Sequence, residues 1–350
     1  MSPILMERYR SFLPITEATP IISLGEGNTP LVRAIRLEKE FGCGQLYFKL
    51  ESCNPTGSFK DRGMVVAVAN AMERGNKAIV CASTGNTSAA TAAYATRFGL
   101  TAVVVVPKGG LATGKLAQAF VFGAKIVVID GTFDRALDVA RALSQRHPVV
   151  LVNSINPYRI QGQKTASFEI IDELGDAPDA FFIPVGNAGN ISAYWQGFVE
   201  YHQAGKASRR PRMMGFQAEG AAPIVRGTAV ANPQTIASAI RVGNPASWQG
   251  AVAARDESEG VIDSVTDDEI MEAYRLMAIA EGIFGEPAAA APLAGLMKMA
   301  RNGHDFSRQR VVCVVTGSGL KDPETALKYT SIPKELPPDV AAVEAALGWG

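Results

Sequence analysis

The chain has 350 residues, of which 47% are hydrophobic and 19% charged, so it favours about two domains with buried cores and excludes a disordered chain. Its 34 Lys and Arg residues balance 34 Asp and Glu residues, which argues against nucleic acid and anionic membrane surfaces as partners. No apolar run reaches the roughly 18 residues that a membrane span requires, so we expect no membrane partner.

Short β-branched segments alternate with longer segments of helical periodicity, which predicts parallel strands joined by crossover helices. The expected strands are residues 45–49, 78–82, 102–107, 125–130, 149–153, 181–185, 213–217 and 311–316. The expected helices are residues 59–74, 88–98, 116–122, 133–143, 159–174, 191–202, 267–281 and 288–301. The sequence therefore predicts an open α/β fold.

The strands and helices divide unevenly along the chain. Residues 51–153 carry four strand-and-helix units of their own, which suits a smaller α/β domain beside a larger sheet. We therefore expect a smaller domain of residues 51–153 and a larger domain formed by residues 1–50 and 154–350.

The first segment that could take part in catalysis is residues 54–63 (Asn-Pro-Thr-Gly-Ser-Phe-Lys-Asp-Arg-Gly), which contains a lysine just after a turn. Ser58 is expected to cap a helix, with Asp61 in a capping-box-like position, which places Lys60 in the first helical turn. Partial positive charge at a helix N-terminus favours a neutral amine, and a neutral amine is what a Schiff base with a carbonyl cofactor requires. A solvent-pointing lysine beside a helix cap is the alternative.

Two further turns join a strand to a helix and are rich in small residues. Residues 82–89 (Ala-Ser-Thr-Gly-Asn-Thr-Ser-Ala) offer hydroxyls and backbone N–H groups to an anion, although ordinary helix capping also accounts for them. Residues 184–191 (Pro-Val-Gly-Asn-Ala-Gly-Asn-Ile) expose consecutive backbone amides at a helix N-terminus. That arrangement is typical of a phosphate cradle, whereas a plain turn needs only one glycine.

A fourth segment, residues 153–160 (Asn-Ser-Ile-Asn-Pro-Tyr-Arg-Ile), predicts another helix start. Asn156 is expected to cap this helix, with Pro157 at its first position and Arg159 in its first turn. An arginine at a positive helix end indicates an anion held between them, and surface packing of the long side chain is the alternative.

Two other segments resemble nucleotide-binding loops incompletely. Residues 109–116 keep a phosphate-loop spacing until Leu116, where a Ser or Thr should meet Mg²⁺. Residues 317–319 (Gly-Ser-Gly) begin like a dinucleotide loop but lack its third glycine, so we interpret them as the rim of a site.

The cysteines and histidines argue against several kinds of site. Cysteines at 43, 53, 81 and 313 are scattered, which predicts no disulfide framework and fits a reducing, cytoplasmic setting. The first residues show no leader peptide. Histidines at 147, 202 and 304 are far apart, so neither a metal site nor a Ser-His-Asp triad is expected.

The lysine segment, the Asn86 loop, the loop at 186–190 and Thr316 together resemble the β-family of pyridoxal-phosphate enzymes, also called fold type II. Within it, the chain is similar to the threonine synthases from residues 24–31 to residues 317–319, because Thr87 rather than His follows Asn86 and the phosphate loop carries Asn187 and Asn190. The resemblance implies two open, twisted, largely parallel sheets flanked by helices, with the active site between the domains.

The resemblance also implies roles for individual residues. Lys60 forms the Schiff base with pyridoxal 5′-phosphate, Asn86 contacts its phenolic oxygen, and Thr316 meets its pyridine nitrogen, whose protonation a neutral hydroxyl restrains. The cofactor phosphate is held in the larger domain by Gly186, Asn187, Ala188, Gly189 and Asn190. The substrate carboxylate and phosphate are contacted by Ser83, Thr84, Thr87, Asn153, Ser154 and Arg159.

Two anion sites around one lysine motivate a specific hypothesis: conversion of O-phospho-L-homoserine and water to L-threonine and phosphate, the last step of threonine biosynthesis. Lys60 would take the Cα proton, loss of a Cβ proton would release the γ-phosphate, and water would add at Cβ. A threonine or serine dehydratase, or another β-replacement enzyme, is the nearer alternative. A phosphate-sensing or nucleotide-binding protein without a covalent cofactor is the more distant one. The resemblance implies a homodimer.

Overall fold

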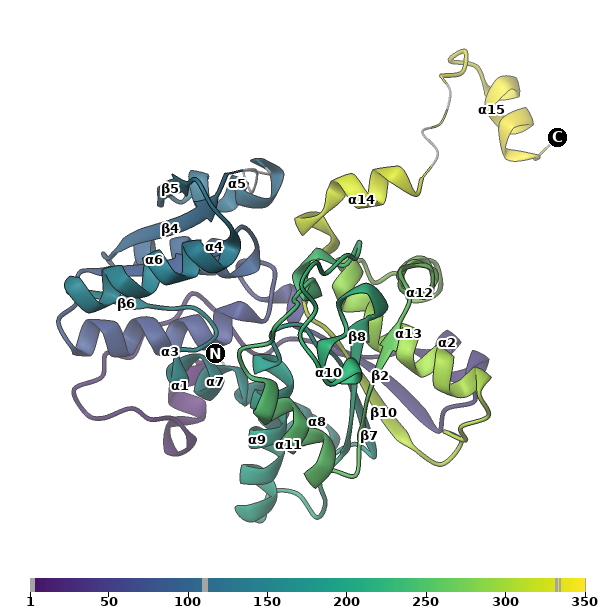
Figure 1. The fold of residues 1–350 in the computed structure, drawn as a ribbon. Helices are drawn as coiled ribbons and strands as arrows, with labels where there is room; N and C mark the ends of the chain where they lie inside the picture. Colours follow the sequence, from purple (N-terminus) through teal and green to yellow (C-terminus); the bar gives the residue numbers. More distant parts are fainter. Residues whose placement is uncertain (1–3, 109–112, 331–332, 334, 350) are drawn as a thin grey trace.

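A computed structural model of the chain describes residues 4–108, 113–330, 333 and 335–349. Its strands form two separate sheets with helices packed around them (Figure 1). The larger sheet has the order β1-β2-β10-β7-β8-β9, with the bounds Leu31–Arg33, Gln45–Leu50, Arg310–Val315, Ala180–Pro184, Arg212–Ala218 and Val261–Val265. The smaller sheet has the order β5-β4-β3-β6, with the bounds Lys125–Ile129, Thr101–Pro107, Ala78–Ala82 and Val149–Leu151.

Both sheets are built almost entirely from parallel pairs. In the larger sheet only β1 runs antiparallel to its neighbour, with Val32 opposite Phe48. The central strands β7 and β10 are apolar and buried, as expected for parallel strands covered on both faces. The predicted α/β fold is therefore confirmed, and in each sheet the carboxyl ends of the parallel strands share one edge.

The helices that cover the sheets lie mostly between consecutive strands. The longer helices are α3 (Lys60–Glu73), α4 (Asn86–Arg97), α5 (Thr113–Val121), α6 (Phe133–Arg146), α8 (Thr165–Leu174), α9 (Gly189–Gln203), α11 (Trp248–Glu257), α12 (Asp267–Glu281), α13 (Pro287–Arg301) and α15 (Val340–Leu347). The shorter ones are α1 (Leu5–Arg8), α2 (Ile35–Glu40), α7 (Pro157–Gln163), α10 (Pro223–Arg226) and α14 (Pro323–Lys328). Figure 1 shows α15 apart from the other elements, beyond α14.

Helices α3 and α7 cross at very close range, and two glycines permit the contact. A Cβ atom at Gly63 would lie 2.6 Å from the carbonyl oxygen of Arg159, and one at Gly162 would lie 2.0 Å from that of Arg62. Any larger side chain would separate the two backbones. The crossing therefore places the Arg159 side chain, on α7, beside the first turn of α3, where Lys60 lies.

The eight expected strands are all present within one or two residues of their predicted ends, but two strands were missed. Strand β1 has only three residues, and β9 carries Asp263 and Ser264 at a half-buried sheet edge, so neither has the apolar pattern of the other strands. The helix expected over residues 159–174 is divided into α7 and α8, which meet at Lys164. Part of the incomplete phosphate loop, residues 109–112, lies outside the described residues.

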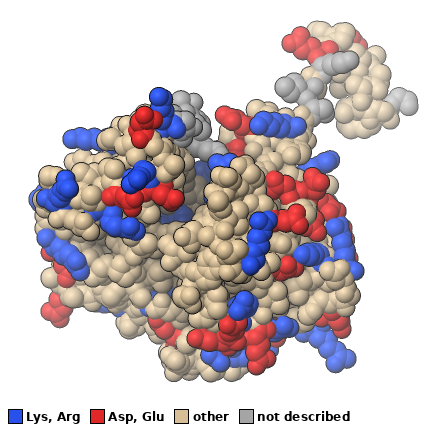
Figure 2. Space-filling model, viewed as in Figure 1, with Lys and Arg blue, Asp and Glu red and all other residues tan. Residues whose placement is uncertain are grey.

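The surface agrees with the balanced composition. Figure 2 shows Lys and Arg interspersed with Asp and Glu over the face drawn. No helix among the described residues is long and apolar enough to cross a membrane. In the same part of the chain, no group of three or more His, Cys, Asp and Glu side chains is arranged to hold a metal ion.

Candidate active site

The loops after β3, β6, β7 and β10 meet, and hydrogen bonds join those of one sheet to those of the other. Asn86, after β3, donates from Nδ2 to Glu286 Oε1 at 3.0 Å, beside the end of β10. Asn187, after β7, donates from Nδ2 to the hydroxyl of Ser154, after β6. The carboxyl ends of both sheets thus enclose one site, which is where parallel α/β sheets place their ligands.

The lysine turn is attached to the end of β10. The backbone N–H of Phe59 donates to the carbonyl of Thr316 at 3.0 Å, and that of Ser318 donates to Gly57 at 2.9 Å. Thr316 itself is buried. Lys60 and Thr316, separated by 256 positions in sequence, are therefore held side by side by backbone hydrogen bonds.

The expected capping box at this turn is wrong. Helix α3 begins at Lys60 with Phe59 as its N-cap residue, whose side chain makes no cap, while the Ser58 hydroxyl accepts a long hydrogen bond of 3.4 Å from the N–H of Lys60. The Asp61 carboxylate instead accepts hydrogen bonds from the backbone N–H of Thr56 at 2.6 Å and from its hydroxyl at 2.5 Å. The carboxylate turns back because the preceding turn offers two donors to it, and burial raises the pKa of Asp61 to about 7.

Lys60 has the electrostatic character that its position in the helix predicted, although the main cause is different. Burial of the amine, followed by the positive charge of Arg159, lowers the pKa of Lys60 to about 7, and the carboxylate of Glu286 opposes the shift. The residue remains partly accessible to solvent. Lys60 is therefore a partly buried residue whose amine is neutral in a substantial fraction of molecules near pH 7.

The loop of residues 186–190 is shaped by close packing and an unusual backbone conformation. A Cβ atom at Gly186 would lie 2.9 Å from the Cα atom of Ile240, so a larger residue would displace the loop. Ala188 adopts a left-handed conformation with φ of 65°, and α9 begins at the next residue, Gly189. The first N–H groups of α9 therefore face the end of β7, in the geometry of an anion site.

The two asparagines of this loop have different surroundings. The Asn187 amide is engaged, because its Oδ1 accepts from the backbone N–H of Ala246 at 2.6 Å while Nδ2 binds Ser154. Asn190 is buried, and neither atom of its amide has a hydrogen-bond partner among the described residues. Buried polar atoms in proteins are almost always satisfied, so the amide of Asn190 indicates a ligand at this loop.

Arg159 also carries buried side-chain atoms at this site that lack a hydrogen-bond partner among the described residues. Its side chain is fully buried, and Nη1 donates to the carbonyl of Val152 at 2.8 Å. Its Nε and Nη2 atoms have no partner within the described part of the chain, and burial lowers the pKa of the guanidinium to about 10. The predicted cap holds, since Asn156 accepts from the N–H of Tyr158 and Pro157 occupies the first helical position.

The remaining predicted contacts lie at the ends of β3 and β6. Both amide atoms of Asn153 pair with the backbone of Ala82 at 2.9 Å, so this side chain joins the ends of the two strands. Ser83 accepts from the N–H of Gly85 at 3.2 Å. Thr84 and Thr87 are half-buried beside it, so this turn presents hydroxyls at the surface of the site.

Glu286 is a residue of the site that the sequence did not predict. It is 7% exposed, directly precedes α13 and contacts Asn86 from 200 positions away in the chain. The available signal was an acidic residue followed by proline and an apolar helix. Burial raises the pKa of Glu286 to about 7.

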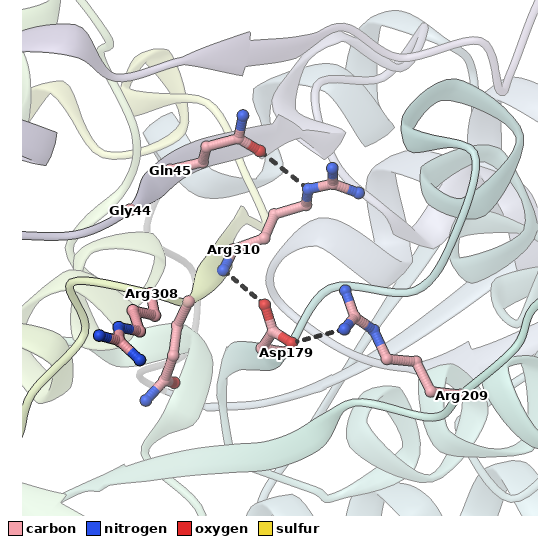
Figure 3. A pocket seen from close by; sticks show the side chains of 7 residues that line it. Gly44, Gln45, Asp179, Arg209, Arg308 and Arg310 are labelled. Carbon is pink, nitrogen blue, oxygen red and sulfur yellow. Dashed lines mark hydrogen bonds and ion pairs between the residues drawn. The ribbon is translucent and has the colours of Figure 1, made fainter.

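A separate surface pocket of about 370 Å³ lies at the opposite edge of the larger sheet (Figure 3). Gln45 and Arg310 begin β2 and β10, and Asp179 directly precedes β7. Arg209 pairs with Asp179 at 2.9 Å, and the Arg310 side chain donates to Gln45 at 2.9 Å. The pocket therefore lies at the amino ends of the strands, away from the loops around Lys60.

Comparison with known proteins agrees with this geometry. A family model described as pyridoxal-phosphate dependent enzyme matches residues 22–317. A threonine synthase of Halalkalibacterium halodurans is 57% identical over 97% of this chain and 95% of its own length. Threonine synthases of Synechocystis and Mycobacterium tuberculosis are each 53% identical over 99% of this chain and over 91% and 96% of their own lengths.

Solved structures share the fold at much lower identity. Maize serine racemase superposes with a TM-score of 0.75 at 21% identity, over 93% of this chain and 94% of that one. A threonine deaminase from Solanum lycopersicum gives 0.73 at 24% identity, over 85% and 81%. The chain therefore belongs to the pyridoxal-phosphate-dependent enzymes of fold type II. Within them it is a member of the threonine synthase family, a group of pyridoxal-phosphate-dependent lyases.

The residues present fit the cofactor of this family. Its aldehyde needs a neutral amine, which Lys60 supplies, and its phosphate needs convergent N–H groups, which the start of α9 supplies. The unpartnered amide of Asn190 lies in the same loop. The fit therefore rests on unsatisfied groups of this chain as well as on its relatives.

Proposed function

We propose that this enzyme converts O-phospho-L-homoserine and water to L-threonine and inorganic phosphate, with Lys60 as its catalytic amine. The observation that carries the proposal is the buried guanidinium of Arg159, with two unpartnered nitrogen atoms beside Lys60. A dehydratase acting on threonine or serine has no phosphate to place there. A substrate with its own phosphate needs this second anion site in addition to the loop at 186–190.

We propose the cofactor contacts from the same residues. Lys60 would hold the aldehyde carbon, Asn86 would contact the phenolic oxygen, Thr316 would meet the pyridine nitrogen, and the phosphate would be held by Gly186, Asn187, Ala188, Gly189 and Asn190. Bound pyridoxal phosphate supplies an electron sink for carbanions next to the substrate nitrogen. Because a threonine hydroxyl is a neutral partner, Thr316 leaves the ring nitrogen less protonated than a carboxylate would.

The chain's own residues then bind the substrate and move its protons. The neutral form of Lys60, which is well populated near pH 7, takes the proton from Cα, and the residue returns protons later in the reaction. Arg159 and Ser154 bind the γ-phosphate as it leaves, and the guanidinium stabilises the negative charge that develops on it. Ser83, Thr84 and Thr87 bind the substrate carboxylate, while Asn153 keeps their turn in place through Ala82.

The test is release of inorganic phosphate from O-phospho-L-homoserine by the purified enzyme, together with formation of threonine. Lys60→Ala should reduce the rate by on the order of 10³-fold or more, because the general base and cofactor anchor are lost. Lys77→Ala, which removes an exposed lysine, is the matched control and should keep the wild-type rate. Consumption of unphosphorylated threonine or serine without phosphate release would instead indicate a dehydratase.

We further propose two domains, residues 51–153 and residues 1–50 with 154–350, in a cytoplasmic homodimer. All four cysteines are free thiols, which supports a reducing compartment. Val340 and Leu347 in helix α15, and Trp349 just after it, expose apolar side chains, which supports contact with a second copy. Light scattering of the purified enzyme should give the mass of a dimer, and cell fractionation should recover the protein with cytoplasmic markers.

A further inference from the structure

Glu286 occupies the position of a helix cap without acting as one. It is the N-cap residue of α13, its backbone is extended, and its side chain accepts no hydrogen bond from the helix. Its backbone N–H donates to the carbonyl of Gly317 at 2.9 Å, and Pro287 follows at the first helical position. The carboxyl group is therefore free to point away from its own helix, and it contacts Asn86.

Gly317 allows this contact. A Cβ atom at residue 317 would lie 2.4 Å from Oε1 of Glu286 and 3.2 Å from Nδ2 of Asn86. Any side chain at this position would displace the carboxyl group from the amide. The absence of a side chain directly after Thr316 thus lets Glu286 reach Asn86 across the end of β10.

The hydrogen bond determines which way the Asn86 amide faces. Nδ2 donates to the two carboxyl oxygens of Glu286 at 3.0 and 3.3 Å. An ionised carboxylate only accepts hydrogen bonds, so it selects the NH₂ group of the amide rather than its oxygen. The other N–H of the same group is then oriented by Glu286 as well.

Three charged groups influence Glu286. Lys60 approaches from α3, Lys321 from the turn after β10, and Asp322 from the residue beyond it. The two lysines favour the carboxylate and Asp322 opposes it, while burial is the largest influence and raises the pKa of Glu286 to about 7. In return, the carboxylate of Glu286 raises the pKa of Lys60, so the two groups are electrostatically coupled.

We propose that Glu286 is a positioning residue that, through its hydrogen bonds to Asn86, orients this amide toward the cofactor. The inference rests on the proposed function, because Lys60 and Asn86 are taken as the cofactor contacts. Glu286 would act on the cofactor indirectly, through the residues that contact the cofactor.

The test is a pH titration of the visible absorption band of the holoenzyme. Glu286→Gln removes the negative charge with little change in shape and allows the Asn86 amide to turn. The nitrogen of Lys60 then loses a partner that favours its protonated form, so the midpoint of the band should move to lower pH by about 1 unit. Glu324→Gln, which removes an exposed carboxylate in α14, is the matched control and should titrate like the wild type.

Gly317→Ala provides a second variant, since it keeps Glu286 but displaces its carboxyl group. It should move the midpoint in the same direction as Glu286→Gln. If the wild-type holoenzyme shows the visible band and both variants titrate with the same midpoint as the wild type, the role of Glu286 is overturned while the proposed function stands. A wild-type holoenzyme preparation without any visible band would overturn both.

Discussion

Two arginines of this protein, Arg62 and Arg159, are completely buried and lie on the two helices that cross at Gly63 and Gly162. Arg62 is surrounded by carboxylates. Its guanidinium binds Glu51 at 2.7 Å and Glu169 at 2.6 Å. Arg159 donates to one backbone carbonyl, and two of its nitrogen atoms have no partner among the residues that the structure describes. The same side chain at the same degree of burial thus has opposite surroundings within one helix pair.

The difference appears in the charges that each guanidinium experiences. The carboxylates outweigh desolvation and raise the pKa of Arg62 well above its ordinary value, whereas burial lowers the pKa of Arg159 to about 10. Lys49 also binds Glu169, at 2.8 Å, which completes a paired cluster of two cations and two carboxylates. A buried charge with partners is part of the fold, and a buried charge without them is where an anionic ligand is expected.

The paired cluster also positions the unpaired site. Arg62 lies two residues after Lys60 in the first turn of α3, and its carboxylate partners come from the end of β2 and from α8. Glu169 additionally accepts from the backbone N–H of Asn28 at 2.8 Å. The start of α3 is therefore fixed on several sides, and Lys60 is held at its place beside Arg159.

The largest expected effect is a loss of stability when Arg62, the paired arginine, is replaced. Arg62→Met should lower the free energy of unfolding by about 3–5 kcal/mol, because Glu51 and Glu169 remain buried without their partner. Arg159→Met, the matched variant, loses one hydrogen bond and an uncompensated charge, so it should cost no more than about 1 kcal/mol. Urea unfolding of the two holoenzyme variants, followed by circular dichroism, measures both values. Equal losses of stability would contradict the distinction between the two arginines.

The next-largest expected effect is on catalysis, where Arg159 is expected to matter directly although it contributes less to stability than Arg62. Arg159→Met should slow phosphate release from O-phospho-L-homoserine by about 10²–10³-fold, because a preorganised donor to the developing charge is removed. With the loop at 186–190 occupied by the cofactor, inorganic phosphate should raise the thermal midpoint of the wild-type holoenzyme and leave that of the Arg159→Met holoenzyme unchanged. Stabilisation of both proteins by phosphate to the same extent would show that Arg159 binds no anion.

Short sequence segments indicated the candidate site residues, but not the distant partners that hold them. Lys60, Asn86, Thr316 and the loop at 186–190 stand in short segments whose glycines, amides and hydroxyls indicate their chemistry. Local patterns also predicted the cap at Asn156, which depends only on its near neighbours along the chain. The eight main strands were also predictable, because the apolar composition that indicates them is a local property of the sequence.

Contacts between distant segments could not be predicted in this way. Glu286 meets Asn86 across 200 positions, and Glu169 meets Arg62 across 107. Nothing near Arg62 in the sequence distinguishes it from Arg159, since both follow shortly after a helix start. Which of the two is paired is decided by α8 and the end of β2, and these approach only in the folded chain.

The smallest expected effect is a shift in the pKa of Lys60. The positive charge of Arg159 is one of the causes that lower this pKa to about 7, so Arg159→Met should raise it by up to about 1 unit. Only the neutral amine attacks an aldehyde, so the rate at which added pyridoxal phosphate develops visible absorbance with the apoprotein should reach its midpoint at higher pH. Arg226→Met, which removes an exposed arginine, is the control and should leave the midpoint unchanged.

The sign of this shift separates charge from packing. Arg159 is positive and Glu286 is negative, and both face Lys60, so removing them should move the protonation of its nitrogen in opposite directions. If both variants moved the midpoint the same way, the cause would be general loosening of the site, because greater access of water weakens the effect of burial on Lys60 in either case. Opposite signs would instead show that the amine of Lys60 is balanced between one unpaired guanidinium and one buried carboxyl group.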